Sequence, residues 1–172
     1  MKIKVLFSTL VFSALMILPL SGYAYSENIV ASLDGESVTV DILTTYVDEV
    51  AGSNYKLWLD DKEGLRKLAD FYINRTLLLE YARETVEKND ALVSNHNARS
   101  VDEDVMYLTS LLKKEVHDKA MVTQDDVHAY MTERQYVSEK QARQELESDR
   151  KNILMTQLIE KVRQGHEISY YY

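Results

Sequence analysis

The stretch DKEGLRKLADFYINRTLLLEYA, residues 61–82, decides the fold class of this chain. Its apolar side chains recur every three or four residues, which is the period of one face of an α-helix. This stripe contains Leu65, Leu68, Ala69, Tyr72, Ile73, Thr76, Leu77 and the run 79–82. Asp60, Asp61 and Glu63 stand at its amino end, where the helix dipole favours negative charge. The pattern predicts one long helix from Asp60 or Asp61 to about Asn89.

Toward the N-terminus, the sequence predicts a β-hairpin and a shorter helix. The β-prone runs 29–33 and 37–40 flank Asp34-Gly35, a strong hairpin turn. Helical periodicity then starts near Asp41, and Gly52-Ser53-Asn54 ends it. The apolar face of this helix is formed by Leu43, Tyr46, Val47 and Val50. A short segment with the single tryptophan, Trp58, leads into the long helix.

Toward the C-terminus, three more helices and a strand are predicted. The first runs from about Asn95 to Lys119. Capping boxes beginning at Thr123 and Ser138 open a short helix and a last long helix. The apolar stripe of the last helix is Ala142, Leu146, Ile153, Leu154, Leu158, Ile159 and Val162. Gly165 caps it, and residues 166–172 alternate as a strand. The fold class is therefore mainly α, with about five helices, a short N-terminal β-hairpin and a C-terminal strand that pairs with it.

Residues 1–24 are expected to be a secretory signal peptide, leaving a single domain over residues 25–172. Lys2 and Lys4 precede an apolar run that ends at Pro19, and small residues stand before the expected cleavage after Ala24. The apolar run is short for a spanning helix, which argues against stable membrane insertion once the signal is removed. We expect an exported protein, with the periplasm ranked first and the cell surface or secretion as alternatives.

Composition excludes several classes of protein. The 172 residues contain no cysteine, which rules out zinc fingers, disulfide scaffolds and thiol nucleophiles. The charge is −8, and cleavage after Ala24 would leave 148 residues with a charge of −10. Such acidity argues against nucleic-acid binding, which needs a basic surface. The same acidity disfavours acidic binding partners.

Three stretches, in order, resemble the chaperone domain of SurA, PpiD and PrsA type exported foldases. Residues 29–39 are similar to that family's strand, turn and polar-capped first helix. Residues 72–82 are similar to its most recognisable helix, and residues 122–131 to its short acidic-capped helix. The resemblance spans nearly all of residues 29–172 and implies a SurA N-terminal-domain-like fold.

The chain departs from the family pattern in having no room for a parvulin prolyl-isomerase module. Only residues 134–137 separate the short helix from the last helix, and the chain ends at Tyr172. The paired histidines and proline pocket of that module are also missing. We therefore expect no prolyl-isomerase activity.

What the resemblance implies is a chaperone-like holdase or assembly factor that binds unfolded or extended polypeptide in a cradle of helices. Adaptable apolar and aromatic side chains suit such binding, because clients vary in sequence. The candidate binding residues are Tyr46, Tyr55, Trp58, Met106, Tyr107, Tyr130, Met131 and Tyr136. For any one of them, core packing is the competing interpretation.

No catalytic residue, metal ligand or cofactor is predicted, and the protein is expected not to be an enzyme. The four histidines are scattered, and the acidic pairs Asp60-Asp61 and Asp125-Asp126 are explained by helix capping. The main alternative is a non-enzymatic adaptor that binds one dedicated partner in a secretion or export assembly. A secreted hydrolase whose triad forms only in the fold is a third possibility. A homodimer formed by exchange of a strand or helix is also compatible with the pattern.

Overall fold

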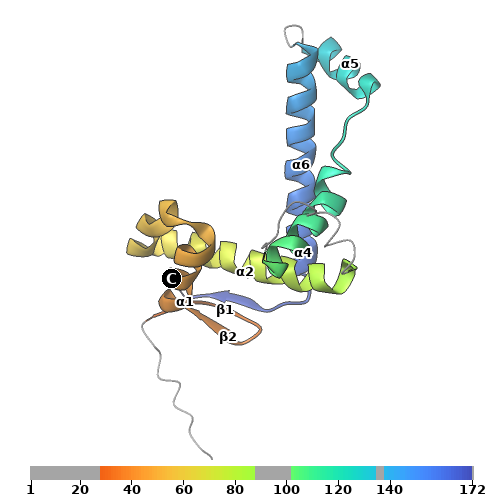
Figure 1. Ribbon diagram of the computed structural model, residues 1–172. Helices are drawn as coiled ribbons and strands as arrows, with labels where there is room; N and C mark the ends of the chain where they lie inside the picture. The colour runs from red at the N-terminus through yellow and green to blue at the C-terminus, as the bar shows by residue number, and fades with distance from the viewer. Residues whose placement is uncertain (1–27, 88–101, 135–137, 172) are drawn as a thin grey trace, which may run out of the picture.

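A three-stranded sheet joins the two ends of the described chain. The computed structural model describes residues 28–87, 102–134 and 138–171 (Figure 1). Strands β1 (Ile29–Leu33) and β2 (Glu36–Thr39) form the predicted hairpin. Strand β3 (Ile168–Tyr170) pairs antiparallel with the other side of β1, so the order is β2-β1-β3. The predicted pairing of the N-terminal and C-terminal strands is confirmed.

The hairpin turn has the backbone that its sequence demands. Asp34 has φ of 50° and Gly35 has φ of 84°, and a two-residue turn of type I′ needs positive φ at both positions. The Asp34 N–H donates to the Glu167 carbonyl at 2.8 Å, and the Glu167 N–H donates to the Asp34 carboxylate at 2.8 Å. The turn residue thus also fixes the segment that leads into β3.

Between the hairpin and the long helix, the chain forms three short helical pieces. Helix α1 (Val40–Tyr46) continues into the π-helical turn η1 (Val47–Ala51). Gly52, with φ of 96°, ends this turn as predicted. The 3₁₀ helix η2 (Ser53–Asp60) then carries Trp58. Of the expected apolar face, Leu43 and Val47 are buried, whereas Val50 is 49% exposed.

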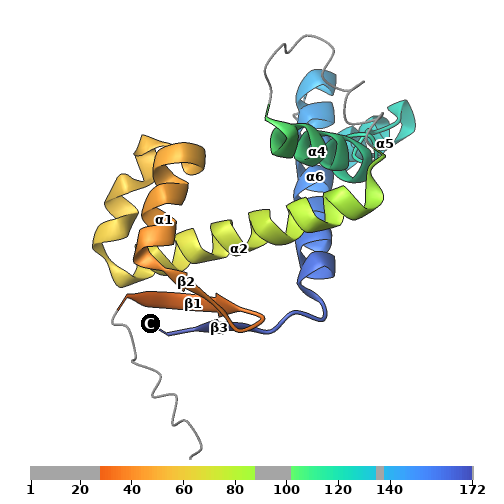
Figure 2. The ribbon, with the colours of Figure 1, turned by 60° about the horizontal axis from the view of Figure 1, so that its bottom comes forward.

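Helix α2 (Lys62–Thr85) is the axis of the molecule, and α1, β1, α4 and α6 all contact it (Figure 2). Its N-cap is Asp61, whose carboxylate accepts from the Gly64 N–H at 2.7 Å, so the capping role predicted for the Asp60-Asp61 pair is confirmed for Asp61. The main core forms along the predicted stripe of α2. Its fully buried large side chains are Leu43, Leu68, Ile73, Leu77, Leu111, Val30 and Val47.

Helix α4 (Glu103–Leu112) begins later than the sequence pattern indicates. Asp102 has a non-helical backbone, with ψ of 133°, and its carboxylate accepts from the Asp104 N–H at 3.1 Å. The predicted helix from Asn95 therefore does not run unbroken through Asp102, because an N-cap residue leaves the helical conformation. Residues 95–101 lie outside the described part of the chain. A π-helical turn, η3 (Lys113–His117), continues α4.

Helices α5 (Gln124–Glu133) and α6 (Glu139–Arg163) start at the two predicted capping boxes, both of which are formed. The second half of α6 packs on the main core, whereas its first half projects from the body together with α5 (Figure 1). We call α5 and the first half of α6 the arm. A separate small core of Val122, Val127 and Ala142 holds the arm together.

The predicted apolar stripe of α6 is wrong at Ile153. This side chain was expected to be buried, but it is 57% exposed, because only part of the helix circumference is covered where α6 leaves the body. At the other end of α6, Arg163 donates to Asp70 at 3.2 Å, to Asn74 at 2.8 Å and to the Tyr170 hydroxyl at 3.0 Å. These bonds join α6, α2 and β3.

Among the described residues, no helix combines the length and apolar character needed to cross a membrane. The expected signal peptide, residues 1–24, lies outside the described ranges.

Candidate functional site

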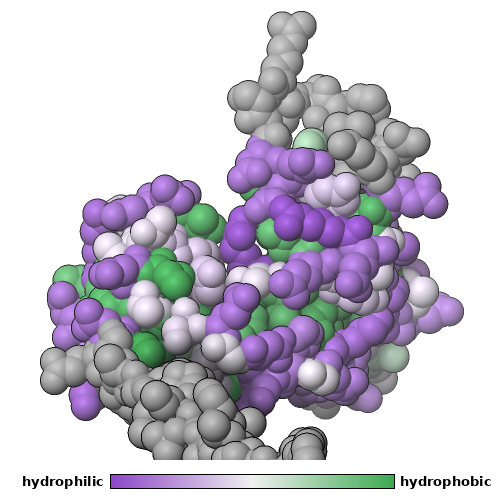
Figure 3. Space-filling view, turned by 90° about the horizontal axis from the view of Figure 1, so that it is seen from below, coloured by the Kyte–Doolittle hydropathy of each residue, from purple (hydrophilic) through white to green (hydrophobic). Residues whose placement is uncertain are grey.

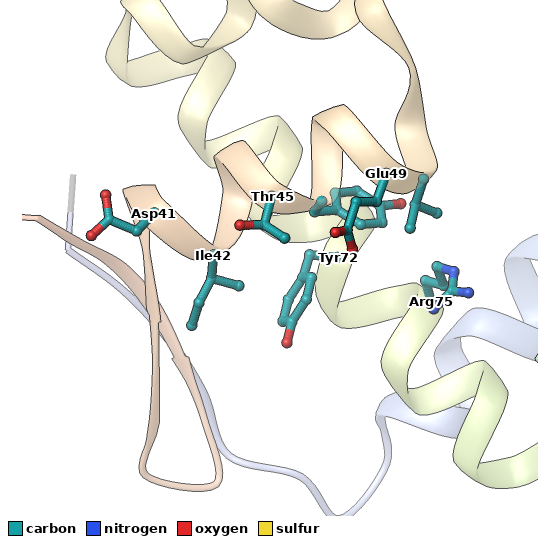
Figure 4. A pocket seen from close by; sticks show the side chains of 8 residues that line it. Asp41, Ile42, Thr45, Glu49, Tyr72 and Arg75 are labelled. Atoms are coloured by element: carbon teal, nitrogen blue, oxygen red, sulfur yellow. The ribbon is translucent and has the colours of Figure 1, made fainter.

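An open pocket of about 390 Å³ lies where α1 and η1 meet α2. Its lining is formed by Asp41, Ile42, Thr45, Tyr46, Glu49, Val50, Tyr72 and Arg75. Figure 4 shows the opening below α1, with the hairpin on one side and α2 on the other. The side chains of Ile42 and Tyr72 extend into it in the same direction. We call this feature the Tyr46–Tyr72 pocket.

Helical spacing explains why these side chains share one pocket. Residues four apart on a helix lie on the same face, which groups Ile42 with Tyr46 and Asp41 with Thr45. Four residues further on, Val50 continues the row of Ile42 and Tyr46, and Glu49 continues the row of Asp41 and Thr45. On α2, Tyr72 and Arg75 are three residues apart and also share a face.

Two tyrosines form the apolar centre of the pocket. The rings of Tyr46 and Tyr72 meet edge to face, with centroids 5.6 Å apart and planes at 81°. Such pairs add roughly 0.5–1.5 kcal/mol beyond the area that they bury. Burial raises the pKa of the Tyr46 phenol, although the Arg75 guanidinium opposes that rise and Tyr55 adds to it. The phenol therefore stays neutral at physiological pH.

The rim of the pocket carries two carboxylates without a partner. Asp41 and Glu49 are exposed, and neither makes a hydrogen bond or ion pair within the part of the chain that the structure describes. The one basic residue of the lining, Arg75, lies 3.8 Å from Asp104 of α4. Asp104 is also bound by Arg83 at 2.7 Å. The rim is therefore negative on the α1 side.

Beside the pocket lies an aromatic cluster, which we define as Tyr55, Trp58 and Phe71. Tyr55 meets the other two rings edge to face, at 5.1 Å from Trp58 and 5.9 Å from Phe71. Phe71 is 41% exposed, and the neighbouring Leu57 is 76% exposed. The cluster thus leaves apolar surface in contact with water. Hydrophobic patches are also visible on the face seen from below, on both sides of an indentation (Figure 3).

The candidate residues from the sequence do not form one surface. Tyr46 lines the pocket, and Tyr55 and Trp58 lie in the aromatic cluster. Met106 and Tyr107, on α4, are half-buried against the main core.

Two further candidates, Tyr130 and Met131, belong to the arm, where they pack on its small core. The Tyr130 hydroxyl donates to Glu145, and the Arg134 guanidinium lies 5.0 Å from its ring centroid. Tyr130 therefore makes its hydrogen bond and its cation–π contact within the arm. Tyr136 lies outside the described residues.

Sequence reasoning identified only Tyr46 among the residues that line the pocket. The others were given to the core, as Tyr72 and Val50 were, or received no role. The signal that could have found them is the repeat of four residues from Asp41 and Ile42 onward, together with Tyr72 and Arg75 on one face of the next helix.

Other titratable groups have structural roles. The Asp126 carboxylate accepts from the Thr123 N–H at 2.9 Å, so its predicted capping role is confirmed. His166 Nδ1 lies 2.6 Å from the Asp34 carboxylate at the hairpin turn. Within residues 28–87, 102–134 and 138–171, no group of three or more His, Asp or Glu side chains is placed to hold a metal ion.

Comparison of the chain with protein-family models, with curated proteins and with solved structures gives no match.

Proposed function

We propose that this protein binds extended polypeptide and keeps it from aggregating, without prolyl-isomerase activity. The observation that carries the proposal is the open Tyr46–Tyr72 pocket. The body also exposes apolar side chains at Leu57 and Phe71. A volume of about 390 Å³ falls within the range of roughly 300–1,000 Å³ typical of ligand pockets. Because the pocket is open, a chain lying across α1 and α2 can insert one side chain while its backbone stays outside.

The chemistry of the lining also supports binding of varied clients. Tyrosine offers a large apolar ring and a polar hydroxyl, so it suits surfaces that are alternately wet and covered. Ile42 and Val50 add aliphatic contact without a directional requirement. A site of this kind selects apolar content rather than one sequence. The resemblance of residues 29–39, 72–82 and 122–131 to exported foldases agrees with this role.

We further propose that the protein acts outside the cytoplasm after cleavage behind Ala24. The mass of the protein purified from its native host measures this directly. A chain that starts at Tyr25 supports export, and a chain that retains residues 1–24 contradicts it.

The experiment uses residues 25–172, which contain every element described above. Chemically unfolded, unrelated proteins are diluted into buffer with and without this chain, and light scattering is recorded beside a prolyl-isomerase assay. We expect less scattering at stoichiometric ratios and no isomerisation. Unchanged scattering for all clients, with capture of a single partner, would instead establish a dedicated adaptor.

Substitutions at Val50 test whether the pocket is responsible. Val50 lines the pocket and is 49% exposed, so Val50→Asp and Val50→Lys place opposite charges there with little loss of core packing. We expect both to reduce the suppression of aggregation, because the surface becomes polar in either case. Ile153→Asp is the matched control, since Ile153 is 57% exposed on α6 and lies outside the pocket lining. Equal activity of all three variants would place the binding surface elsewhere.

A further inference from the structure

We propose that the Tyr46–Tyr72 pocket selects extended segments in which an apolar or aromatic side chain is flanked by lysine or arginine. This inference rests on the proposed function and specifies the class of client. It goes beyond overall acidity, because it assigns the preference to two carboxylates at one pocket. The apolar side chain packs in the pocket against Ile42 and the Tyr46–Tyr72 pair, and the flanking cation lies beside Asp41 or Glu49.

The state of the two carboxylates carries the argument. Among the exposed acids of the described body, Glu36, Glu80 and Glu84 have no cationic partner, whereas Asp48 is 2.8 Å from Lys56 and Glu63 is 2.6 Å from Lys67. Asp41 and Glu49 differ from these acids in lining the Tyr46–Tyr72 pocket. No lysine or arginine of the described chain pairs with either of these two. A cation from a bound segment would supply the missing partner.

The position of the two acids fits an extended ligand. They are eight residues apart along α1 and η1, with Thr45 between them and the apolar side chains Ile42, Tyr46 and Val50 on the adjoining stripe. A segment that follows α1 would therefore meet an acid at each end of the apolar stripe. Alternate residues of an extended chain point to the same side, so cations two residues away from the inserted apolar side chain can reach these acids.

Arg75 does not reverse this preference. Its guanidinium is 3.8 Å from the Asp104 carboxylate, on the side of the pocket that faces α4. An acidic flank on the client would gain from Arg75 only by competing with Asp104, and it would also meet Asp41 or Glu49 on the α1 side of the pocket. Such like-charge contact is unfavourable, which makes the pocket discriminate against acidic segments.

The test compares three labelled peptides that share one apolar core and differ only in their flanks, which are lysine, glutamine or glutamate. Fluorescence anisotropy with residues 25–172 gives the Kd of each peptide at low and at physiological salt. Exposed charge pairs are worth little individually, so we expect the lysine peptide to bind about two- to five-fold more tightly than the glutamine peptide at low salt. Added salt should narrow this ratio.

Variants separate the pocket from the overall negative charge of the chain. Glu49→Gln should remove part of the lysine preference, and Glu49→Lys should make the glutamate peptide the tighter ligand. The matched control is Glu133→Gln, which changes the net charge equally on the arm, at an exposed residue of α5 without an ion pair. It should keep the preference unchanged.

The outcomes distinguish this inference from the proposed function. If the three peptides bind with equal Kd, the charge preference is wrong and polypeptide binding stands. If Glu133→Gln and Glu49→Gln reduce the preference alike, the preference belongs to the net charge and the assignment to this pocket is wrong. If none of the peptides binds, both the inference and the proposed function are wrong.

Discussion

Gly64 determines how closely the 3₁₀ helix η2 can lie against the start of α2. A Cβ at this position would lie 2.6 Å from the Trp58 Cα, which is closer than a Cβ can approach another backbone atom without displacing it. Trp58 is in turn part of the aromatic cluster beside the pocket. Because Gly64 has no Cβ, η2 can pack closely against α2 and place Trp58 in the aromatic cluster.

We predict that Gly64→Ala destabilises the protein, although alanine is ordinarily the better helix former. The added methyl group must displace backbone atoms of η2, and overpacking of this kind costs roughly 1–3 kcal/mol. Urea unfolding of the variant measures the loss. Gln157→Ala, at an exposed position of α6, is the control, and we expect it to change stability by less than about 0.5 kcal/mol. An unchanged midpoint for Gly64→Ala would contradict the close approach of η2.

Asp34 gives a prediction about pH at the hairpin turn. Its hydrogen bond to His166, and next its bond from the Glu167 N–H, hold the pKa of the carboxyl below its ordinary value of 3.8. A carboxyl whose pKa is lowered by folding stabilises the folded state above its unfolded value, and that stabilisation is lost as pH falls through the folded pKa. Asp34 therefore contributes stability at neutral pH that disappears in acid below about pH 4.

We predict that Asp34→Asn is less stable than the natural chain at pH 7 and that the difference shrinks between pH 4 and pH 2. Urea midpoints taken over this range test the prediction. Glu36→Gln, an exposed carboxyl on the adjacent strand, controls for the change in net charge. A stability difference that stays constant across the acid range would show that the charge of Asp34 is irrelevant.

At the scale of the elements, the arm is held by less buried surface than the body. Its core comprises Val122, Val127 and Ala142, whereas the body has a larger core built around the buried side chains of α2. Polar contacts supplement the small core: Arg143 donates to the Val122 carbonyl at 2.9 Å, and Arg150 lies 2.9 Å from Asp126. Elements with few buried contacts open more readily than the rest of a protein.

We predict that Thr123→Ala loosens α5 selectively. The capping box at Thr123 satisfies backbone N–H groups at the start of this helix, and loss of an N-cap costs about 0.5–2 kcal/mol. Hydrogen exchange should become faster in α5 and remain unchanged in α2. Thr132→Ala, on the same helix but outside the capping box, is the control. Equal acceleration in both helices would mean that the arm and the body unfold as one unit.

The elements were largely predictable from the sequence because their signals are local. Periodicity located α2, α5 and α6, and capping residues at Asp61, Thr123 and Ser138 located their starts within a residue. The start of α4 was misplaced because the apolar pattern continues before Asp102, although the backbone leaves the helix there. The periodicity of apolar residues indicates which face of a helix is buried, whereas the capping residue indicates where the helix begins.

The pocket was not predictable in the same way, because it depends on how two helices cross. Tyr72 and Val50 both fit an apolar stripe, yet Tyr72 is half-buried and Val50 is exposed where α1 and η1 leave a gap against α2. Similarly, Ile153 follows the stripe of α6 but lies where the helix leaves the body. A stripe shows which face is apolar and gives no indication of how much of it a neighbour covers.

At the scale of the whole molecule, the body and the arm present separate apolar surfaces. α6 extends from the body to the arm (Figure 1), and α1 and α4 lie on the same side of α2 (Figure 2). Within the described residues, the Tyr46–Tyr72 pocket combines an aromatic pair, aliphatic side chains and unpaired carboxylates. We therefore expect the body to bind clients first, with the arm free to contact the rest of a long chain.

The most direct measurement is an NMR titration of isotopically labelled residues 25–172 with the lysine-flanked peptide. We predict that amide shifts concentrate in residues 41–50 and 72–75, with little change in α5. The Val50→Asp variant should lose these shifts while keeping the rest of its spectrum. Shifts confined to the arm, or no shifts at saturating peptide, would contradict binding of extended polypeptide at the Tyr46–Tyr72 pocket.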